Sequence, residues 1–301
     1  MASRPVIQAG RDTMRLWHRT GLVSAPAPGV VAPVTVVSCL VARRCGGGYA
    51  APKAAGSVAL VTGANRGIGL AFVRELAARG AKKVYAGVRE PGALADEFAG
   101  LPAEVVPLDV TDPAAAGAAA DACQDVNLLV NNAGLFTNTR LVLTSDPDAA
   151  RREMEVNYFG VLNMTRAFAP VLGANGGGYI VNVLSVAGAF PAPFMGGYSP
   201  AKAAALFLSS ITRSELADQG TEVIALIVGS VDTRMAAHVQ GRKEDPRDIV
   251  RAGLDALDRG EHLADTDFMA IDARARYNRD PARYERGMTK LLKATVMDTG
   301  R

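Results

Sequence analysis

The sequence predicts an α/β fold: a doubly wound parallel sheet in a single domain, with helices on both faces. Two observations carry this prediction. Short runs of Val, Ile and Leu alternate along the chain with longer amphipathic segments, the pattern of strands joined by helical crossovers. A glycine-rich turn, residues 62–69, connects the first such strand to the first helix. Strands that are apolar throughout need cover on both faces, and right-handed crossovers then give the doubly wound arrangement.

The expected elements follow each other regularly after residue 57. Strands are predicted at Val58–Thr62, Val84–Val88, Glu104–Asp109, Val126–Asn131, Tyr179–Ser185 and Glu222–Val228. Helices are predicted between them near residues 66–79, 91–98, 113–123, 147–172 and 199–218, then near 246–259, with a polar terminal helix from Arg274 to Leu292 interrupted at Pro281.

Residues 1–57 differ from the rest in composition. They hold seven basic residues against the single acid Asp12, and they show no sustained periodicity. We expect them to be a disordered or leader extension, with residues 58–301 forming the domain. An Arg-rich start with few acids also suits an organelle transit peptide, whereas the domain itself is expected in the cytoplasm.

Charge, cysteine content and hydropathy exclude several classes of protein. The chain has 301 residues and a net charge of +3, but acids outnumber bases beyond residue 57, so we expect no nucleic-acid partner. Cys39, Cys45 and Cys123 are too few and too scattered for a disulfide framework or a zinc site, and we expect no metal. The apolar stretch 30–42 is broken by Pro33 and is shorter than the about 20 residues that span a bilayer, so we expect no membrane anchor.

The glycine turn has the chemistry of a phosphate site. Gly63, Gly67 and Gly69 let the backbone turn tightly and approach a pyrophosphate at the N-terminus of the following helix, whose dipole favours the negative charge. A tight turn without a ligand remains the alternative on this motif alone.

Three further motifs occur in register with the turn. They are Asn131-Asn132-Ala133-Gly134, the set Asn157, Ser185, Tyr198 and Lys202, and Val228-Gly229-Ser230-Val231-Asp232-Thr233. Together with the G-x-x-x-G-x-G spacing of the turn, they resemble the short-chain dehydrogenase/reductase family over about residues 57–260. Val228 departs from the family's proline in the last motif.

The resemblance implies a Rossmann fold, a nicotinamide cofactor and a set of site residues. The catalytic residues it implies are Asn157, Ser185, Tyr198 and Lys202, with Ser185 holding the substrate oxygen and Asn157 fixing a water. The cofactor-binding residues it implies are Gly63, Asn65, Arg66, Gly67, Ile68, Gly69, Arg89, Asp109, Val110, Asn131, Ala133, Gly134, Tyr198, Lys202, Val231 and Thr233. In an alternative interpretation Asp109 is the N-cap of the helix predicted near 113–123, but we assign that cap to Thr111 or Asp112.

The end of the second predicted strand favours NADP(H) over NAD(H). An NAD-binding fold places an acid there against the ribose 2′-hydroxyl. The corresponding position is Val88, followed by Arg89, whose planar guanidinium suits a 2′-phosphate, and Arg66 is expected to close on the same phosphate. The alternative is that both arginines are merely solvated and that Glu90 serves NAD.

Tyr198 and Lys202 lie four residues apart and therefore share one face of a helix. A phenol with a pKa of about 10 is a poor general base at neutral pH. We expect the ammonium of Lys202 to lower the pKa of Tyr198 and to bind the nicotinamide ribose.

The predicted function is that of an NADP(H)-dependent oxidoreductase acting on a carbonyl or secondary alcohol, with Tyr198 as general acid/base. The alternatives are a non-catalytic NADP-binding sensor of the same fold and a sugar-nucleotide epimerase or dehydratase. A homodimer or homotetramer is expected through helices 147–172 and 199–218. An apolar substrate pocket, or ordinary core, is expected from Leu135, Phe136, Val186, Ala187, Phe190, Phe194 and Met235, and none of His18, His238 and His262 is expected beside the site.

Overall fold

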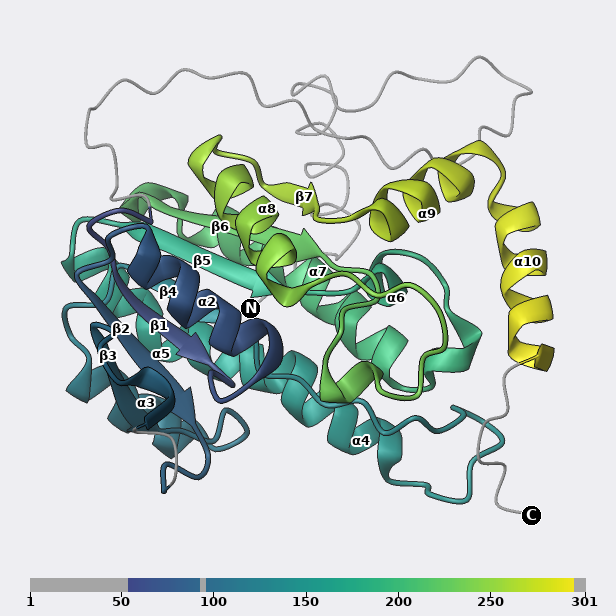
Figure 1. The fold of residues 1–301 in the computed structure, drawn as a ribbon, viewed down its shortest axis with the longest axis horizontal. Coiled ribbons are helices and arrows are strands. Elements are labelled where there is room, and N and C mark those ends of the chain that lie inside the picture. Colours follow the sequence, from purple (N-terminus) through teal and green to yellow (C-terminus); the bar gives the residue numbers. More distant parts are fainter. Residues whose placement is uncertain (1–53, 93–95, 295–301) are drawn as a thin grey trace, which may run out of the picture. The chain divides into compact units, whose positions relative to one another are not determined.

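The computed structural model describes residues 54–92 and 96–294. Within these residues, seven parallel strands form one sheet in the order β3-β2-β1-β4-β5-β6-β7 (Figure 1). The strands are β1 (Val58–Thr62), β2 (Lys83–Val88), β3 (Ala103–Pro107), β4 (Leu128–Asn131), β5 (Gly178–Val183), β6 (Thr221–Ile227) and β7 (Leu263–Asp265). The order reverses between β1 and β4, which confirms the predicted doubly wound sheet.

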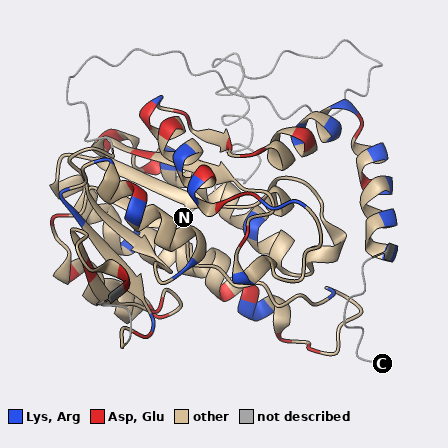
Figure 2. Ribbon diagram, in the orientation of Figure 1, with Lys and Arg blue, Asp and Glu red and all other residues tan. Residues whose placement is uncertain are grey.

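One face of the sheet is covered by α2 (Gly67–Ala78) and α8 (Pro246–Asp258), which lie side by side in Figure 1. Their buried Phe72, Leu76 and Leu254 pack with apolar residues of the strands. Acidic and basic residues alternate along α8 in Figure 2, and Arg79 at the end of α2 lies 2.8 Å from Asp255 of α8. Apolar burial therefore holds the pair on the sheet, and ion pairs at its outer edge add little.

The opposite face is covered by α3 (Pro113–Ala122), α5 (Gly160–Ala174) and α7 (Tyr198–Glu215). Met164 and Phe168 of α5 are fully buried against the strands, and Ala205 of α7 packs on Ala225 and Ile227 of β6. These helices follow the strands whose carboxyl ends carry the predicted site, so their positions fix that edge of the sheet.

The helix predicted at 147–172 is not continuous. It consists of α4 (Ala149–Met154), a π-helical turn η2 (Glu155–Phe159) and α5. The π turn inserts an extra residue per turn in the middle of the helix, and the buried Asn157 lies within it. Such turns are rare and concentrate at functional sites, and apolar periodicity does not reveal them.

Other boundaries also differ from the predictions. The helix predicted near 91–98 is described only as the short 3₁₀ turn η1 (Asp96–Phe98). Strand β7 was missed because it spans three residues without an apolar run. The terminal helix predicted from Arg274 instead comprises α9 (Phe268–Arg279), which begins after the N-cap Asp267, and α10 (Pro281–Ala294). Ser185 ends no strand but caps a short helix, α6 (Val186–Ala189).

The predicted extension, residues 1–57, lies outside the described residues up to residue 53. The last four of its residues are described, and they pack on the domain. Ala54 and Ser57 are buried, the Ser57 hydroxyl donates to the Ala54 carbonyl, and Gly56 N donates to Gly80 O. The packed part of the chain therefore begins before Val58.

Candidate active site

The glycine turn between β1 and α2 has the shape of an anion site. Gly63 and Gly67 have φ of +64° and +54°, which side chains rarely adopt, and a Cβ on Gly67 would lie 3.1 Å from Thr233 Cγ2. Helix α2 has Arg66 as its N-cap without a side-chain cap bond, and no acid lies in its first turn. The N–H groups at this end are therefore available to a phosphate, as a nicotinamide dinucleotide would require.

Gly69 has a different role from its neighbours. A Cβ at this position would collide with the Gly63 carbonyl oxygen and come within 2.6 Å of Asn132 Nδ2. Gly69 thus allows the turn to close on itself.

The turn is joined to the 131–134 segment by two residues that the sequence analysis did not single out. Thr62 Oγ1 accepts from the backbone N–H groups of Asn132 and Ala133, both at 3.0 Å. Asn132 Nδ2 donates to the carbonyl oxygens of Thr62 at 2.8 Å and Gly63 at 3.2 Å. The signal was present, because Thr62 and Asn132 belong to the two motifs, but spacing alone does not show which side chains connect them.

Three arginines gather beside the turn. The pKa of Arg66 is lowered, first by burial and then by the positive charges of Arg234 and Arg89. Within the described residues, no ion pair joins any of the three to a carboxylate. Arg89 also lies near the carboxylate of Asp109, whose pKa its charge helps to lower. A cluster of cations that repel each other and form no ion pair in the described part of the chain is suited to an anionic ligand. Arg234 was missed because it lies far away in sequence, directly after Thr233.

The position expected to carry the acid of an NAD site is buried. Val88 is 3% exposed and packs in the core, whereas Arg89 and Glu90 are exposed. Of these three side chains, only those of Arg89 and Glu90 are therefore exposed at this edge.

The carboxylate of Asp109 lies after β3 with one oxygen already engaged. Its Oδ1 accepts from Thr111 N at 2.9 Å and Thr111 Oγ1 at 2.7 Å, and these bonds lower the pKa of Asp109. The N-cap of α3 is Asp112, whose Oδ1 accepts from Ala114 N, so Asp109 is left out of the cap. Val110 is buried against Gly160, where a Cβ would come within 2.7 Å of Val110 Cγ2.

The side chain of Asn131 belongs to a buried chain of hydrogen bonds inside the fold. Its Nδ2 donates to Asn182 Oδ1 at 2.9 Å, and Asn182 Nδ2 donates to Ser209 Oγ of α7 at 2.8 Å. This chain links β4, β5 and α7. The following Ala133 and Gly134 bring the backbone to the edge of the sheet beside Asn157.

The segment after β6 reaches back to the glycine turn. Val231 is buried, Thr233 Oγ1 lies 3.4 Å from Val231 O, and Thr233 contacts Gly67 as described. Val228, in place of the family's proline, is buried and accepts from Val186 N at 2.9 Å. Asp267 fixes the turn that follows, because its Oδ2 accepts from Gly229 N at 2.7 Å.

Asn157 is held on all sides by the chain around it. Its Nδ2 donates to Leu135 O at 2.7 Å and Glu153 O at 2.8 Å, and its Oδ1 accepts from Leu135 N at 3.2 Å. A Cβ on Gly134 would lie 3.1 Å from this Oδ1 and 3.8 Å from Lys202 Nζ. Both amide hydrogens are used, so only Oδ1 has capacity for a water.

Ser185, Tyr198 and Lys202 are all buried next to each other. Ser185 Oγ accepts from Ala187 N at 3.1 Å, and a hydrogen bond with Ser185 acts to lower the pKa of Tyr198. Lys202 Nζ donates to Val183 O at 2.8 Å and lies 5.7 Å from the centroid of the Tyr198 ring. The fold thus brings together the four residues of the predicted catalytic set.

The expected lowering of the pKa of Tyr198 by Lys202 is not found. Burial raises the pKa of Tyr198 to about 12, opposed by the hydrogen bond with Ser185 and reinforced by the charge of Glu153. Burial also lowers the pKa of Lys202 to about 8. Desolvation disfavours the charged form of both groups, and it sets the direction of both shifts.

The apolar residues that were expected to line a substrate pocket fall into two groups. Phe136 packs edge-on against Tyr198 with ring centroids 5.4 Å apart, and Ala187 and Phe194 belong to the same cluster. Phe190 instead packs with Tyr277 of α9 and with α10, so core was the correct alternative there.

One histidine was wrongly excluded from this region. The ring of His238 lies 5.3 Å from that of Phe136, centroid to centroid. Phe136 therefore packs between His238 and Tyr198. His18 lies outside the described residues.

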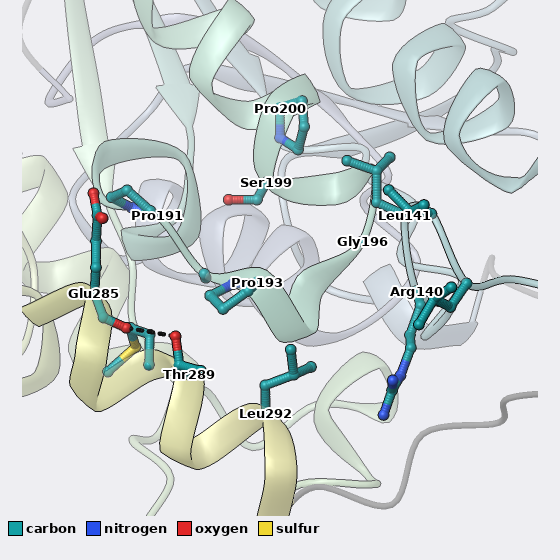
Figure 3. A pocket seen from close by; sticks show the side chains of 14 residues that line it. Arg140, Leu141, Pro191, Pro193, Gly196, Ser199, Pro200, Glu285, Thr289 and Leu292 are labelled. Carbon is teal, nitrogen blue, oxygen red and sulfur yellow. Dashed lines mark hydrogen bonds between the residues drawn. The ribbon is translucent and has the colours of Figure 1, made fainter.

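A cavity of about 540 Å³ opens next to the start of α7 (Figure 3). Its walls include Leu141, Pro191, Pro193 and Ser199, with Leu292 of α10 on the far side. Ser199 follows Tyr198 directly, but none of the four predicted catalytic residues and none of the seven predicted pocket residues lines this cavity.

Across residues 54–92 and 96–294, no group of three or more His, Cys, Asp or Glu side chains is placed to hold a metal ion. No helix in the same part of the chain has the length and apolar character needed to cross a bilayer.

Comparison with known proteins gives one consistent answer. The family described as short chain dehydrogenase matches residues 57–244. A crystal structure of a short chain dehydrogenase from Burkholderia cenocepacia J2315 in complex with NADP is 40% identical, with a TM-score of 0.74, and the match covers 80% of this chain and 99% of that one. A short chain dehydrogenase/reductase from Burkholderia phymatum in complex with NAD is 27% identical, with a TM-score of 0.69 and coverage of 77% and 96%.

A curated relative, dehydrogenase/reductase SDR family member 7B of Bos taurus, is 32% identical over 195 residues, which are 60% of this chain and 59% of the relative. The matched region thus spans less than two thirds of that protein. The fold, the motifs in register and these matches agree, and the chain belongs to the short-chain dehydrogenase family.

Proposed function

We propose that the protein is an NADP(H)-dependent oxidoreductase that interconverts a carbonyl compound and a secondary alcohol, with Tyr198 as general acid/base. The observation that carries this proposal is the burial of Ser185, Tyr198 and Lys202 side by side, with Asn157 and Lys202 both reaching the space beside Gly134. The bound nicotinamide would donate or accept the hydride. The chain's own task is then to hold the cofactor and the substrate oxygen and to move one proton.

The residues around the glycine turn fit the cofactor. The uncapped N-terminus of α2 suits the pyrophosphate, and Arg66 and Arg89, which form no ion pair with the described residues, suit the additional 2′-phosphate of NADP(H). The similarity to the Burkholderia cenocepacia enzyme in complex with NADP supports this preference, although the Burkholderia phymatum enzyme holds NAD.

The proton chemistry follows from the protonation states in the site. With its pKa at about 12, Tyr198 keeps its phenol proton at neutral pH and is ready to donate it to a substrate oxygen held by Ser185. Lys202 has a pKa of about 8 and is mostly charged at pH 7, so its ammonium group can supply a proton to replace the one that Tyr198 donates.

Turnover tests this proposal directly. Wild type is expected to oxidise NADPH in the presence of a panel of aldehydes and ketones, and Tyr198→Phe is expected to lower kcat by about 10²- to 10⁴-fold while NADPH still binds. Tyr277→Phe is the matched control, because Tyr277 lies in α9 and its ring packs on Phe190. NADPH binding without turnover of any substrate would favour the sensor, and retention of more than a tenth of kcat in Tyr198→Phe would contradict the role of Tyr198.

We also propose that the protein is a homodimer or homotetramer. Within the helical segment 147–172, the apolar residues Val161, Met164 and Phe168 are buried in the core and are not available to a second copy. The apolar residues left exposed on the two helical segments are Phe159 (40%), Phe207 (72%) and Ile211 (57%). A second copy that covers this face would bury them. A monomeric mass by light scattering at micromolar concentration would contradict the proposal.

We also propose a cytoplasmic location. Cys123, the cysteine within the described residues, is free and buried, as expected in a reducing compartment. Microscopy of the full chain with a C-terminal tag tests it, and import into an organelle would contradict it.

A further inference from the structure

Glu153 is a buried carboxylate that the proposed chemistry does not use. It lies in α4, one turn before Asn157, and its side chain is 0% exposed. Charged side chains are almost never buried to this extent unless they are paired. Within the described residues, no Lys or Arg forms an ion pair with Glu153.

One carboxylate oxygen ties down the segment that follows the 131–134 motif. Glu153 Oε1 accepts from Thr137 N and from Thr137 Oγ1, both at 2.8 Å. The backbone carbonyl of Glu153 accepts from Asn157 Nδ2, and Asn157 in turn binds both backbone groups of Leu135. Residues 135–137 are therefore held by Glu153 and Asn157 together.

The other oxygen faces the start of the helix that carries Tyr198. Glu153 Oε2 is buried without a hydrogen bond of good geometry, but it lies close enough to the backbone N–H of Gly197 for that N–H to act to lower the pKa of Glu153, and a Cβ on Gly197 would lie 2.7 Å from it. Gly197 is the N-cap of α7, which has no side-chain cap bond and no acid in its first turn. A carboxylate at this end interacts favourably with the helix dipole, and it lies next to the residue before Tyr198.

Several other charged or polar groups lie near Glu153 and Tyr198. Lys202 and Ser185 lie beside Tyr198, and the charge of Glu153 raises the pKa of Tyr198. Burial raises the pKa of Glu153 itself, opposed by its two bonds from Thr137 and by the charge of Arg152. Arg152 is exposed and paired with Asp146, so it does not neutralise Glu153 directly.

We propose that Glu153 is a positioning residue of the active site, whose carboxylate holds residues 135–137 against the start of α7 and places a negative charge at the N-terminus of the helix that carries Tyr198. This inference rests on the proposed role of Tyr198 as general acid/base. We expect the negative charge of Glu153 to disfavour loss of the phenol proton of Tyr198. We expect the two hydrogen bonds from Thr137 to hold residues 135–137 in place.

The effect of the Glu153 charge on Tyr198 is tested by the pH dependence of alcohol oxidation by the full chain. In Glu153→Gln, a near-isosteric change, the limb of the kcat/KM profile that reports Tyr198 is expected to move to lower pH by roughly one pH unit, because a repelling negative charge is removed. Glu155→Gln is the matched control, since Glu155 is an exposed carboxylate two residues further along the same helical segment. Its profile is expected to coincide with that of wild type.

The tie to the loop is tested without turnover. Hydrogen exchange of the peptide covering residues 133–139 is expected to be at least tenfold faster in Thr137→Val and in Glu153→Ala than in wild type or Glu155→Gln. Thr137→Val keeps the charge of Glu153, so its pH limb is expected to stay in place.

The outcomes separate the two proposals. If wild type turns over and Tyr198→Phe does not, but the Glu153→Gln limb coincides with the Glu155→Gln limb, the role of Glu153 is refuted while the proposed function stands. If Thr137→Val moves the limb as far as Glu153→Gln does, the charge is not the cause. If wild type has no turnover but exchange changes as expected, the proposed function fails and the role of the Glu153 charge fails with it, and only the tie between Glu153 and residues 135–137 is retained.

Discussion

Replacing Lys202 with Met is expected to stabilise the free protein at neutral pH while it removes activity. Burial lowers the pKa of Lys202 from 10.5 to about 8, so the charged form that prevails at pH 7 is disfavoured in the folded state. At 1.36 kcal/mol per pKa unit, this difference costs about 3 kcal/mol of the free energy of unfolding. Met has similar length and no charge, but it leaves the Val183 carbonyl without its donor, which costs about 1 kcal/mol. The expected net gain is about 2 kcal/mol.

The sign of the pH dependence follows from the same numbers. Between pH 8 and 10.5 the unfolded chain binds more protons at Lys202 than the folded protein does, so wild-type stability rises with pH relative to the variant. The advantage of Lys202→Met is therefore largest below pH 8 and is lost above pH 10.5. Urea unfolding at pH 7 and pH 10.5, at one protein concentration, measures both differences.

Lys82→Met is the matched control, because Lys82 is exposed and its replacement removes one positive charge without removing a buried one. A stability difference between wild type and Lys202→Met that is the same at both pH values would refute the assigned cost of burial. So would a variant that is less stable than wild type at pH 7.

Three further predictions concern the cofactor site and the domain boundary. Arg89→Ala should raise KM for NADPH by about 10- to 100-fold and leave KM for NADH nearly unchanged, because a charge-assisted bond is worth about 1.5–3 kcal/mol; equal effects in steady-state kinetics with both cofactors would point to Glu90 instead. Gly69→Ala should lower Tm and weaken NADPH binding, since its Cβ would collide with the turn, whereas Gly117→Ala, with nothing within 4 Å, should be neutral or stabilising; equal Tm values for the two would contradict this. A chain starting at Val58 should melt below one starting at Tyr49 in scanning fluorimetry, because it lacks the buried Ala54; coincident melting curves would move the boundary to residue 58.

Apolar periodicity and motif spacing were sufficient for the sheet and its covering helices. Val, Ile and Leu runs mark strands that are buried on both faces, so six of the seven described strands were predicted within a few residues. What periodicity does not encode is the interruption of a helix. The π turn at Glu155–Phe159 leaves the apolar pattern intact, yet it determines where Asn157 lies.

The site shows the same division. Residues within motifs, such as Tyr198 and Lys202, were predicted to share a helix face because local spacing determines this. Contacts made over long sequence separations, such as that of Arg234 with Arg66, were missed. The direction of the pKa of Tyr198 was also wrong, because the attraction to Lys202 was counted and the cost of burying both groups was not.

The most direct test of the central claim is transfer of deuterium from NADPH deuterated at C4 to a ketone or aldehyde that wild type reduces. The account predicts that the alcohol product of wild type gains one deuterium by mass spectrometry, that Tyr198→Phe forms this product about 10²- to 10⁴-fold more slowly, and that the variant still binds NADPH in a fluorescence titration. Deuterated alcohol from Tyr198→Phe at a rate near that of wild type would contradict the account.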